Sequence, residues 1–413
     1  MQPRIMKPLT VPHDDLYQAF THSQLITGVE TFTIDPGIDR SITAECFLAL
    51  STTYFGMKHH EKTVITQGLS RYSAALQTVH KALADENASR SFDVLEAVMI
   101  IAVVEFLVSE REHGWISHAR GFERLLESWG PERISYLPSL LVFEKCRASM
   151  IFAALVLRQT TILAEHDWKF LPWAQFPGRV NSIKLLTDIL ADCPELFALH
   201  DQVLQMQTNQ NSHDIQLRLL LKKAEKICGN LHQWNAAWAK DNGQVFSEVL
   251  PPITTPCSLN PFGKETLPWT SVFQFESLYH ANALTLYHAT LILVLRFVAS
   301  VRCTLGEVDD EEFSKQQTRS AGLFICRSVD YHLNQTWTEL GAFNLLFPLR
   351  MAYEAVGREH GAIGLWLQKV LEDVSTGKRG IWKSAKAIMD ITGSFAKPNS
   401  TQNTGFELRH VRY

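Results

Sequence analysis

The feature that most constrains the fold is an apolar run over residues 94–108, VLEAVMIIAVVEFLV, in which only Glu96 and Glu105 are charged. A helix that is hydrophobic around nearly its whole circumference belongs in the middle of a large core, with other helices around it. The run has 15 residues, fewer than the roughly twenty that a helix needs to cross a bilayer. Asp93, three residues before Glu96, resembles the start of a capping box and predicts where this helix begins.

A second helix is expected directly after this run. Residues 109–114 are a polar connection, and Gly130 with Pro131 ends the next apolar pattern, as Gly and Pro commonly do just beyond a helix. The two helices should form a hairpin with one buried and one half-buried arm, and we expect the rest of the chain to be organised around it. The apolar stripe of the second arm is Trp115, Ala119, Phe122, Leu126 and Trp129.

Further helices are expected wherever apolar residues recur at steps of three and four. No run of alternating residues predicts a strand, so the fold class is all-α: a large multi-helix domain built around the buried central helical hairpin. One clear amphipathic face is Leu69, Tyr72, Leu76, Val79 and Leu83. The other expected helices span residues 16–27, 41–57, 140–165, 180–190, 217–238, 272–302, 314–332, 348–357, 360–374 and 381–391.

The most regular of these patterns lies in residues 217–238. A coiled-coil seam between molecules would need charged residues at the flanking heptad positions, and Gly229 would weaken it. Burial in the core of the chain is therefore the preferred interpretation. The residues of this seam are Leu217, Leu220, Ala224, Ile227, Leu231, Trp234 and Trp238.

The domain organisation follows from where these patterns stop. Residues 1–15 contain Pro3, Pro8 and Pro12 and are expected to be an irregular N-terminal segment. Residues 16–393 should form one all-helical domain, with a mobile connection near 200–214, where Gln and Asn accumulate, and a loop over 249–268, which holds five prolines. Residues 394–413 have little apolar periodicity and are expected to be a flexible C-terminal tail.

Composition excludes several classes of function. The 413 residues are 46% hydrophobic, which is enough to build a large core, and a net charge of −4 is not that of a nucleic-acid-binding surface. The seven cysteines are scattered rather than closely paired, so we interpret them as reduced thiols and predict no zinc site. No metalloprotease, nucleophile-elbow or phosphate-loop motif is present. We therefore expect no catalytic, cofactor-binding or metal-binding residues.

Two features keep an alternative open, an all-α enzyme or small-molecule sensor. The acidic run Asp309-Asp310-Glu311-Glu312 is reminiscent of the magnesium-binding acids of terpene cyclases, but it lacks a second acidic cluster and suits the start of a helix better. Helix 272–302 has polar residues on an apolar surface, which could line a pocket but are more simply exposed or bonded to the backbone. These polar residues are His280, Asn282, Thr285, His288 and Arg296.

The hairpin and several flanking segments resemble the central regulatory region of fungal Zn2Cys6 binuclear-cluster transcription factors, and the similarity extends over about residues 17–391. In the hairpin, the similar residues are the 94–105 run, Trp115, His118, Gly121, Leu125, Leu126, Gly130 and Pro131. Outside it, they are Tyr72, Ala75, Leu76, Leu83, Arg147, Leu163, Ala164, Trp168, Pro172, Trp173, Phe347, Pro348, Leu349, Arg350 and Trp366.

The resemblance implies a nuclear transcriptional regulator rather than an enzyme. In the family, six closely spaced cysteines hold two zinc ions and place a helix in the DNA major groove, whereas residues 1–45 of this chain contain no cysteine. We therefore expect the regulatory half alone, either as a natural form or as a truncated gene product, without sequence-specific DNA binding. Its expected partners are a full-length factor, the transcription machinery or a second copy of the chain, with no membrane, and the resemblance suggests control of a secondary-metabolite gene cluster.

Overall fold

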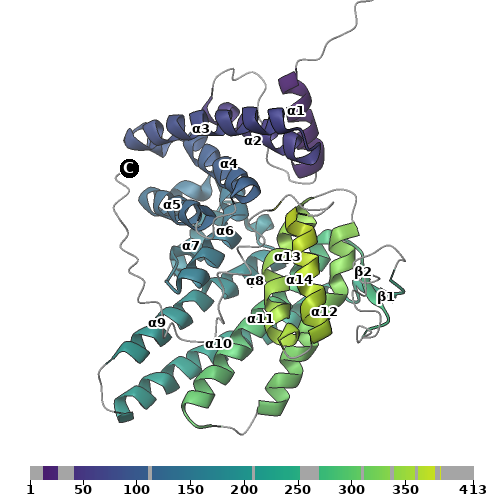
Figure 1. Ribbon diagram of the computed structural model, residues 1–413. Coiled ribbons are helices and arrows are strands. Elements are labelled where there is room, and N and C mark those ends of the chain that lie inside the picture. The colour runs from purple at the N-terminus through teal and green to yellow at the C-terminus, as the bar shows by residue number, and fades with distance from the viewer. Residues whose placement is uncertain are drawn as a thin grey trace, which may run out of the picture. The chain divides into compact units, whose positions relative to one another are not determined.

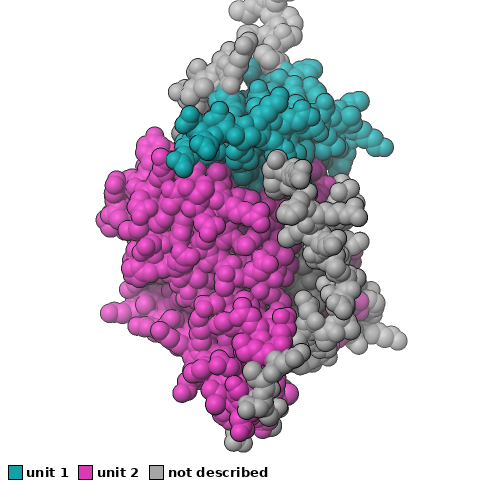
Figure 2. All heavy atoms as spheres, turned by 90° about the vertical axis from the view of Figure 1, so that its left-hand side faces the viewer, with its two compact units in different colours: residues 1–107 teal, residues 108–413 magenta. Residues whose placement is uncertain are grey.

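The computed structural model describes residues 13–26, 41–109, 114–206, 210–251, 269–307, 311–334, 339–358, 361–376 and 382 (Figure 1). The predicted all-α class is confirmed, since the described elements are helices apart from one pair of short strands. The chain divides into two compact units, Met1–Leu107 and Val108–Tyr413 (Figure 2). This division falls at the C-terminal end of the first helix expected in the central hairpin, and the single domain over residues 16–393 stays a prediction.

The first unit contains α1 (His13–Thr21), the π-helical turn η1 (His22–Ile26), α2 (Ile42–Lys58), α3 (Lys62–Ala84), η2 (Ala88–Arg90) and α4 (Phe92–Val108). α2 and α3 form a tight antiparallel pair. Glycine makes this approach feasible, because a Cβ added at Gly68 would lie 2.6 Å from the Thr53 backbone nitrogen. The residues of α3 that are buried are therefore small ones, Gly68, Ala75 and Ala82, together with Val79.

This burial corrects the predicted face of α3. Leu69 is exposed, and Tyr72, Leu76 and Leu83 are only half-buried. Helical periodicity located the correct side of the helix approximately, but a close approach between backbones favours small side chains at the centre of the contact. The large apolar residues consequently lie at its edges.

Asp93 has a different role from the predicted one. Its carboxylate accepts hydrogen bonds from the backbone N–H groups of Ile42 and Thr43, both at 3.1 Å, and so caps the N-terminus of α2. The start of α4 is instead capped by Ser91, whose hydroxyl accepts from Val94 N at 3.3 Å. A carboxylate at a helix N-terminus satisfies free N–H groups and interacts favourably with the helix dipole, so α4 stabilises α2 through this contact.

The second unit begins with α5 (Gly114–Trp129), η3 (Pro131–Ser135) and α6 (Leu137–Leu157). α6 was expected to continue to residue 165, but Arg158 adopts a left-handed conformation (φ 52°, ψ 46°) that ends it. The elements that follow are η4 (Ile162–Ala164), α7 (His166–Phe170), η5 (Leu171–Trp173), η6 (Pro177–Arg179), α8 (Ser182–Ala191), α9 (Cys193–Gln205) and α10 (Gln210–Asn242).

The remainder of the second unit is a cluster of helices that lie side by side (Figure 1). It comprises β1 (Phe246–Val249), β2 (Val272–Phe275), α11 (Leu278–Thr304), α12 (Glu311–Asn334), α13 (Glu339–Ala352), the π-helical turn η8 (Tyr353–Gly357) and α14 (Gly361–Thr376). The first residues of the predicted helix 272–302 instead form β2, which is antiparallel to β1 with Val249 opposite Val272. The helix itself begins after Ser277, whose hydroxyl caps it.

Two long helices form the centre of this unit. The predicted seam of α10 is confirmed as core, because all seven of its apolar residues are buried, and α10 contacts α8, α9 and α11. α11 is, among the described helices, the one long and apolar enough to cross a membrane. However, 72% of its most apolar stretch is buried inside the protein, as expected for a core helix.

Several predicted segments are changed or lie outside the described residues. Residues 200–205 belong to α9 and 210–214 to α10, so the predicted mobile connection is helical there, and 207–209 are outside the described residues. α1 begins at His13, within the segment expected to be irregular, of which 1–12 are not described. Most of the predicted loop at 249–268, the predicted helix 381–391 except Trp382, and the tail 394–413 are also outside the described residues.

Candidate functional site

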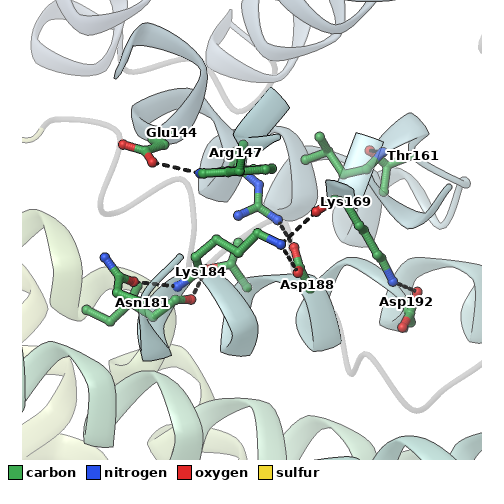
Figure 3. Close-up of polar contacts among 12 residues, drawn as sticks. Glu144, Arg147, Thr161, Lys169, Asn181, Lys184, Asp188 and Asp192 are labelled. Atoms are coloured by element: carbon green, nitrogen blue, oxygen red, sulfur yellow. Dashed lines mark hydrogen bonds and ion pairs between the residues drawn. The ribbon is translucent and has the colours of Figure 1, made fainter. Parts of the chain in front are cut away.

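A network of ion pairs joins α6, α7 and α8 in the second unit (Figure 3). Its centre is Asp188, which pairs with Arg147 of α6 and, at 2.6 Å, with Lys184 one turn earlier on α8. The spacing of four residues places Lys184 and Asp188 on the same face of α8. Asn181 caps this helix by accepting a hydrogen bond from Lys184 N at 2.9 Å, which fixes where that face begins.

Trp173 of η5 brings the two cations together. The Arg147 guanidinium lies 4.8 Å and the Lys184 ammonium 4.5 Å from the centroid of its ring, within the range of cation–π attraction. The indole Nε1 donates a hydrogen bond to Glu144 of α6 at 2.9 Å. Trp173 is thus fixed at its ring by two cations and at its nitrogen by a carboxylate.

Further pairs extend the network outward. Lys184 Nζ also donates to the main-chain oxygen of Lys169 at 2.7 Å, and Lys169 Nζ lies 2.5 Å from Asp192. On the other side, Arg179 pairs with Glu144 at 2.8 Å. The segment between α6 and α8, which contains α7 and three short helical turns, is therefore attached to both helices by charged groups. Such a satisfied polar network favours one conformation of this segment.

Burial shifts the ionisation of these groups. Burial lowers the pKa of Arg147 and of Lys184, and the Asp188 carboxylate opposes both changes. Burial raises the pKa of Asp192, with Lys169 acting in the opposite direction. Each charge has an opposite charge beside it, so the arrangement positions helices and presents no activated nucleophile or general base.

The sequence identified only part of this network. Arg147 and Trp173 were among the residues that carried the family resemblance, and the structure brings them into contact. Asp188, Lys184 and Glu144 were not predicted. The spacing of Lys184 and Asp188 on an expected helix was a usable signal, but nothing in the sequence connects Asp188 with Arg147, which is 41 positions away.

The polar residues of α11 do not converge on one another. Thr285 donates to its own helix at Ala281 O, and Asn282 Oδ1 lies 3.1 Å from Nε2 of the buried His332 of α12. Burial lowers the pKa of His288 to about 3, and its ring lies 4.1 Å from that of Phe324. These separate partners favour the interpretation of structural polar groups over that of one binding pocket.

Arg296 and His280 complete this set. The main-chain N–H of His280 donates to the capping Ser277 hydroxyl at 3.4 Å, while Arg296 contacts Glu354 near the other end of α11. Of the acidic run, Asp309 and Asp310 lie outside the described residues, and α12 begins at Glu311 as the helix-start interpretation predicts. Across the described part of the chain, no group of three or more His, Cys, Asp or Glu residues is arranged to hold a metal ion.

The cysteines of the described residues are free thiols, and Cys46, Cys146, Cys193 and Cys326 are buried. Burial raises the pKa of Cys46 and of Cys146 to about 12 and raises that of the other two as well. A thiol must ionise to act as a nucleophile. These four are therefore core residues.

Comparison with known proteins agrees with the resemblance to fungal transcription factors. Residues 33–168, about a third of the chain, match the family model of a fungal specific transcription factor domain. An uncharacterized protein of Emericella nidulans is 25% identical over 144 residues, which are 34% of this chain and 31% of that protein. The chain thus spans about a third of the length of the curated relative that it matches. No solved structure matches it. The segment from α2 to Trp168 is similar to a fungal specific transcription factor domain, which suggests that the chain regulates transcription.

Proposed function

We propose that the chain is a transcriptional regulator of the fungal zinc-cluster type that acts through protein partners and is not an enzyme. The observation that carries this proposal is the match of residues 33–168 to the fungal specific transcription factor domain. The helical architecture supports it, and so does the ion-pair network, in which Arg147 of the matched segment holds Trp173 just beyond it. Such a network positions helices, as a protein-contact module requires.

A tethering assay tests the regulatory activity directly. The chain is fused to a heterologous DNA-binding domain and placed upstream of a reporter gene. We expect reporter output to differ from that of the DNA-binding domain alone. Asp188→Asn should abolish the difference because it disrupts the network, whereas Asp167→Asn, whose side chain is 70% exposed, should retain it. Unchanged output from the unmodified fusion would contradict the proposed function.

The mode of action needs a separate measurement. We propose that this chain makes no sequence-specific DNA contacts, because its seven cysteines are not spaced as a two-zinc cluster and its net charge is −4. A gel-shift experiment with the purified chain and promoter fragments checks this. Nanomolar, sequence-selective binding would contradict action through partners alone while leaving a regulatory role intact.

Nuclear localisation and control of a secondary-metabolite gene cluster are the finer parts of the proposal, and they rest on the family resemblance. A fluorescent fusion expressed in the host reports the first. Deletion of the gene followed by metabolite profiling reports the second, with loss or gain of one family of products expected. A cytoplasmic fusion or an unchanged profile would overturn the respective part.

A further inference from the structure

Helix α10 has an exposed stripe of side chains that takes no part in its buried seam. The stripe consists of Ile215, Leu219, Lys222 and Lys226, which follow one another at intervals of four, three and four residues. Residues at these intervals share one face of a helix. All four are exposed, whereas the seven seam residues on the other side of α10 are buried. We refer to these four residues as the α10 stripe.

The first half of the α10 stripe is apolar and has apolar neighbours. Ile215 and Leu219 are 58% and 55% exposed. Leu204 and Met206, at the C-terminal end of α9, are 37% and 48% exposed, and residues 207–209 alone separate this end from α10. α9 and α10 contact each other and run antiparallel (Figure 1). Single exposed apolar residues are ordinary on a protein surface, whereas several at one end of a helical pair are typical of a surface that binds a partner.

The second half of the α10 stripe is basic, and its charges are not neutralised by ion pairs. Glu225, the acidic residue of α10 that lies between Lys222 and Lys226 in sequence, pairs with Arg302 of α11 at 2.8 Å. Within the part of the chain that the structure describes, neither lysine forms an ion pair with a carboxylate. Two positive charges therefore lie beside the apolar half on the same exposed face.

The two halves together define the chemistry of a matching partner. The α10 stripe is about 16 Å long, at a rise of about 1.5 Å per residue, so a helix of about three turns covers it. Apolar side chains of such a helix fit over Ile215 and Leu219, because their burial contributes affinity. Carboxylates fit over Lys222 and Lys226, and this charge complementarity determines the direction in which the partner lies.

The α10 stripe suits a protein helix better than a lipid surface. A helix that lies in a membrane interface needs a large apolar face, commonly with Trp or Phe, beside a face rich in basic residues. The stripe offers two side chains of each kind, and the aromatic residues of α10, Trp234 and Trp238, are buried in the core. The apolar area available to a membrane is therefore small.

We propose that the α10 stripe binds an acidic amphipathic helix of a partner protein. Apolar side chains of that helix cover Ile215 and Leu219, and its carboxylates pair with Lys222 and Lys226. The inference rests on the proposed function and deepens it, since it states the chemistry of the partner through which the chain acts.

The test measures binding of two fluorescent peptides to the purified full chain by anisotropy. The first is a helix-forming peptide of about four turns with two leucines and two glutamates on one face at the spacing of the α10 stripe. The second has lysines in place of these glutamates. We expect saturable binding of the glutamate peptide at physiological ionic strength and at least tenfold weaker binding of the lysine peptide. Equal affinities, or no saturable binding of the glutamate peptide, would overturn the proposal.

Charge reversal in the chain tests the basic half. The double variant Lys222→Glu, Lys226→Glu should bind the glutamate peptide at least tenfold more weakly and the lysine peptide more tightly. Lys240→Glu is the matched control, because Lys240 is exposed on the same face about 21 Å beyond Lys226. This control should leave both affinities unchanged. An equal loss in Lys240→Glu would show a general effect of net charge and would contradict the proposed contact.

Leu219→Gln tests the apolar half. It should weaken binding of the glutamate peptide at least tenfold and leave the melting temperature unchanged, because the side chain is exposed. Leu365→Gln is the control, at an apolar residue of α14 that is 44% exposed, and it should bind the peptide as the unmodified chain does. Unchanged binding in Leu219→Gln would show that the peptide does not contact the stripe.

Other occupants of the α10 stripe give different results. Co-sedimentation with vesicles of phosphatidylserine and phosphatidylcholine tests a lipid surface, and analytical ultracentrifugation of the chain alone tests a second copy. Vesicle binding or dimer formation that is lost in Leu219→Gln, without binding of the glutamate peptide, would assign the stripe to that occupant and overturn the proposal.

Failure of this inference is distinguishable from failure of the proposed function, because peptide binding needs no transcriptional readout. A reporter response of the tethered chain without peptide binding would reject the α10 stripe as the contact surface. Peptide binding without a reporter response would reject the regulatory role alone.

Discussion

The phenolic hydroxyl of Tyr72 on α3 donates a 2.9 Å hydrogen bond to Glu105 on α4. Glu105 is one of only two charged residues in the apolar run from which the fold was predicted. Glu105 therefore does not disrupt the core pattern, because its carboxylate accepts a hydrogen bond from the neighbouring helix α3. Burial and the Glu105 carboxylate both raise the pKa of Tyr72, so the hydroxyl keeps its proton at physiological pH.

Removing this hydroxyl should destabilise the first unit. Tyr72→Phe loses a hydrogen bond to a charged acceptor, for which we expect a decrease of about 1.5–3 kcal/mol in the free energy of unfolding. Urea unfolding followed by circular dichroism measures it. Tyr136→Phe is the control, because that side chain is 62% exposed, and its free energy of unfolding should change by less than about 0.5 kcal/mol. Equal effects of the two substitutions would contradict this role of Glu105.

Gly68→Ala tests the close approach of α2 and α3. A Cβ at this position would lie 2.6 Å from the Thr53 nitrogen, so the helices must separate, and such overpacking costs about 1–3 kcal/mol. Gly229→Ala, in α10 with nothing within 4 Å of the added Cβ, should instead stabilise by up to about 1 kcal/mol through helix propensity. Opposite shifts in the urea midpoint are therefore expected, and stabilisation by both variants would show that the α2–α3 contact is looser than described.

Asp188→Asn should be the most destabilising single substitution in the ion-pair network. It leaves the buried Arg147 and Lys184 without the carboxylate that both contact. Breaking a buried ion pair on one side costs about 3–5 kcal/mol. Thermal unfolding compares it with Asp167→Asn, an exposed position one helix earlier. A melting temperature equal to that of Asp167→Asn would mean that the network contributes nothing to stability.

His332 predicts sensitivity to acid. Burial lowers its pKa from 6.5 to about 4, so the unfolded chain binds a proton more readily than the folded one. Its contribution to stability is full above pH 6.5 and is lost as the pH falls from 6.5 toward 4, amounting to about 3 kcal/mol over that window.

The measurement is the free energy of unfolding at a series of pH values between 7 and 4. His332→Gln should reduce the slope of stability against pH in this window. The control His166→Gln, at a side chain that is 80% exposed, should preserve the slope. If both variants keep the slope of the unmodified chain, His332 does not determine the acid response.

Local patterns in the sequence predicted the elements better than the contacts between them. The seam of α10 was predicted correctly because its seven apolar residues lie within one helix and share one periodicity. The capping role of Asp93 was assigned to α4, the helix that contains it, whereas the carboxylate caps α2, about 50 positions earlier. Helical periodicity relates residues within one helix, so it cannot identify a capping partner on another helix.

The same distinction explains the candidate sites. Arg147 and Trp173 were found through resemblance, but the carboxylate that organises them was not, because Asp188 is on a separate helix. Likewise, the spacing of Arg350, Glu354 and Arg358 is visible in the sequence, yet the contact of Glu354 with Arg296 requires α11 to lie beside α13. Residue types can be identified from sequence, whereas their convergence depends on the tertiary fold.

The pairing of β1 with β2 has a practical consequence. Because Val249 and Val272 are opposite one another, the two ends of the intervening stretch are close together, and lengthening that stretch adds little to the entropic cost of closing the loop. A reporter protein inserted between residues 251 and 269 should leave α10 and α11 in register. This chain can therefore carry an internal label that needs no fusion at either end.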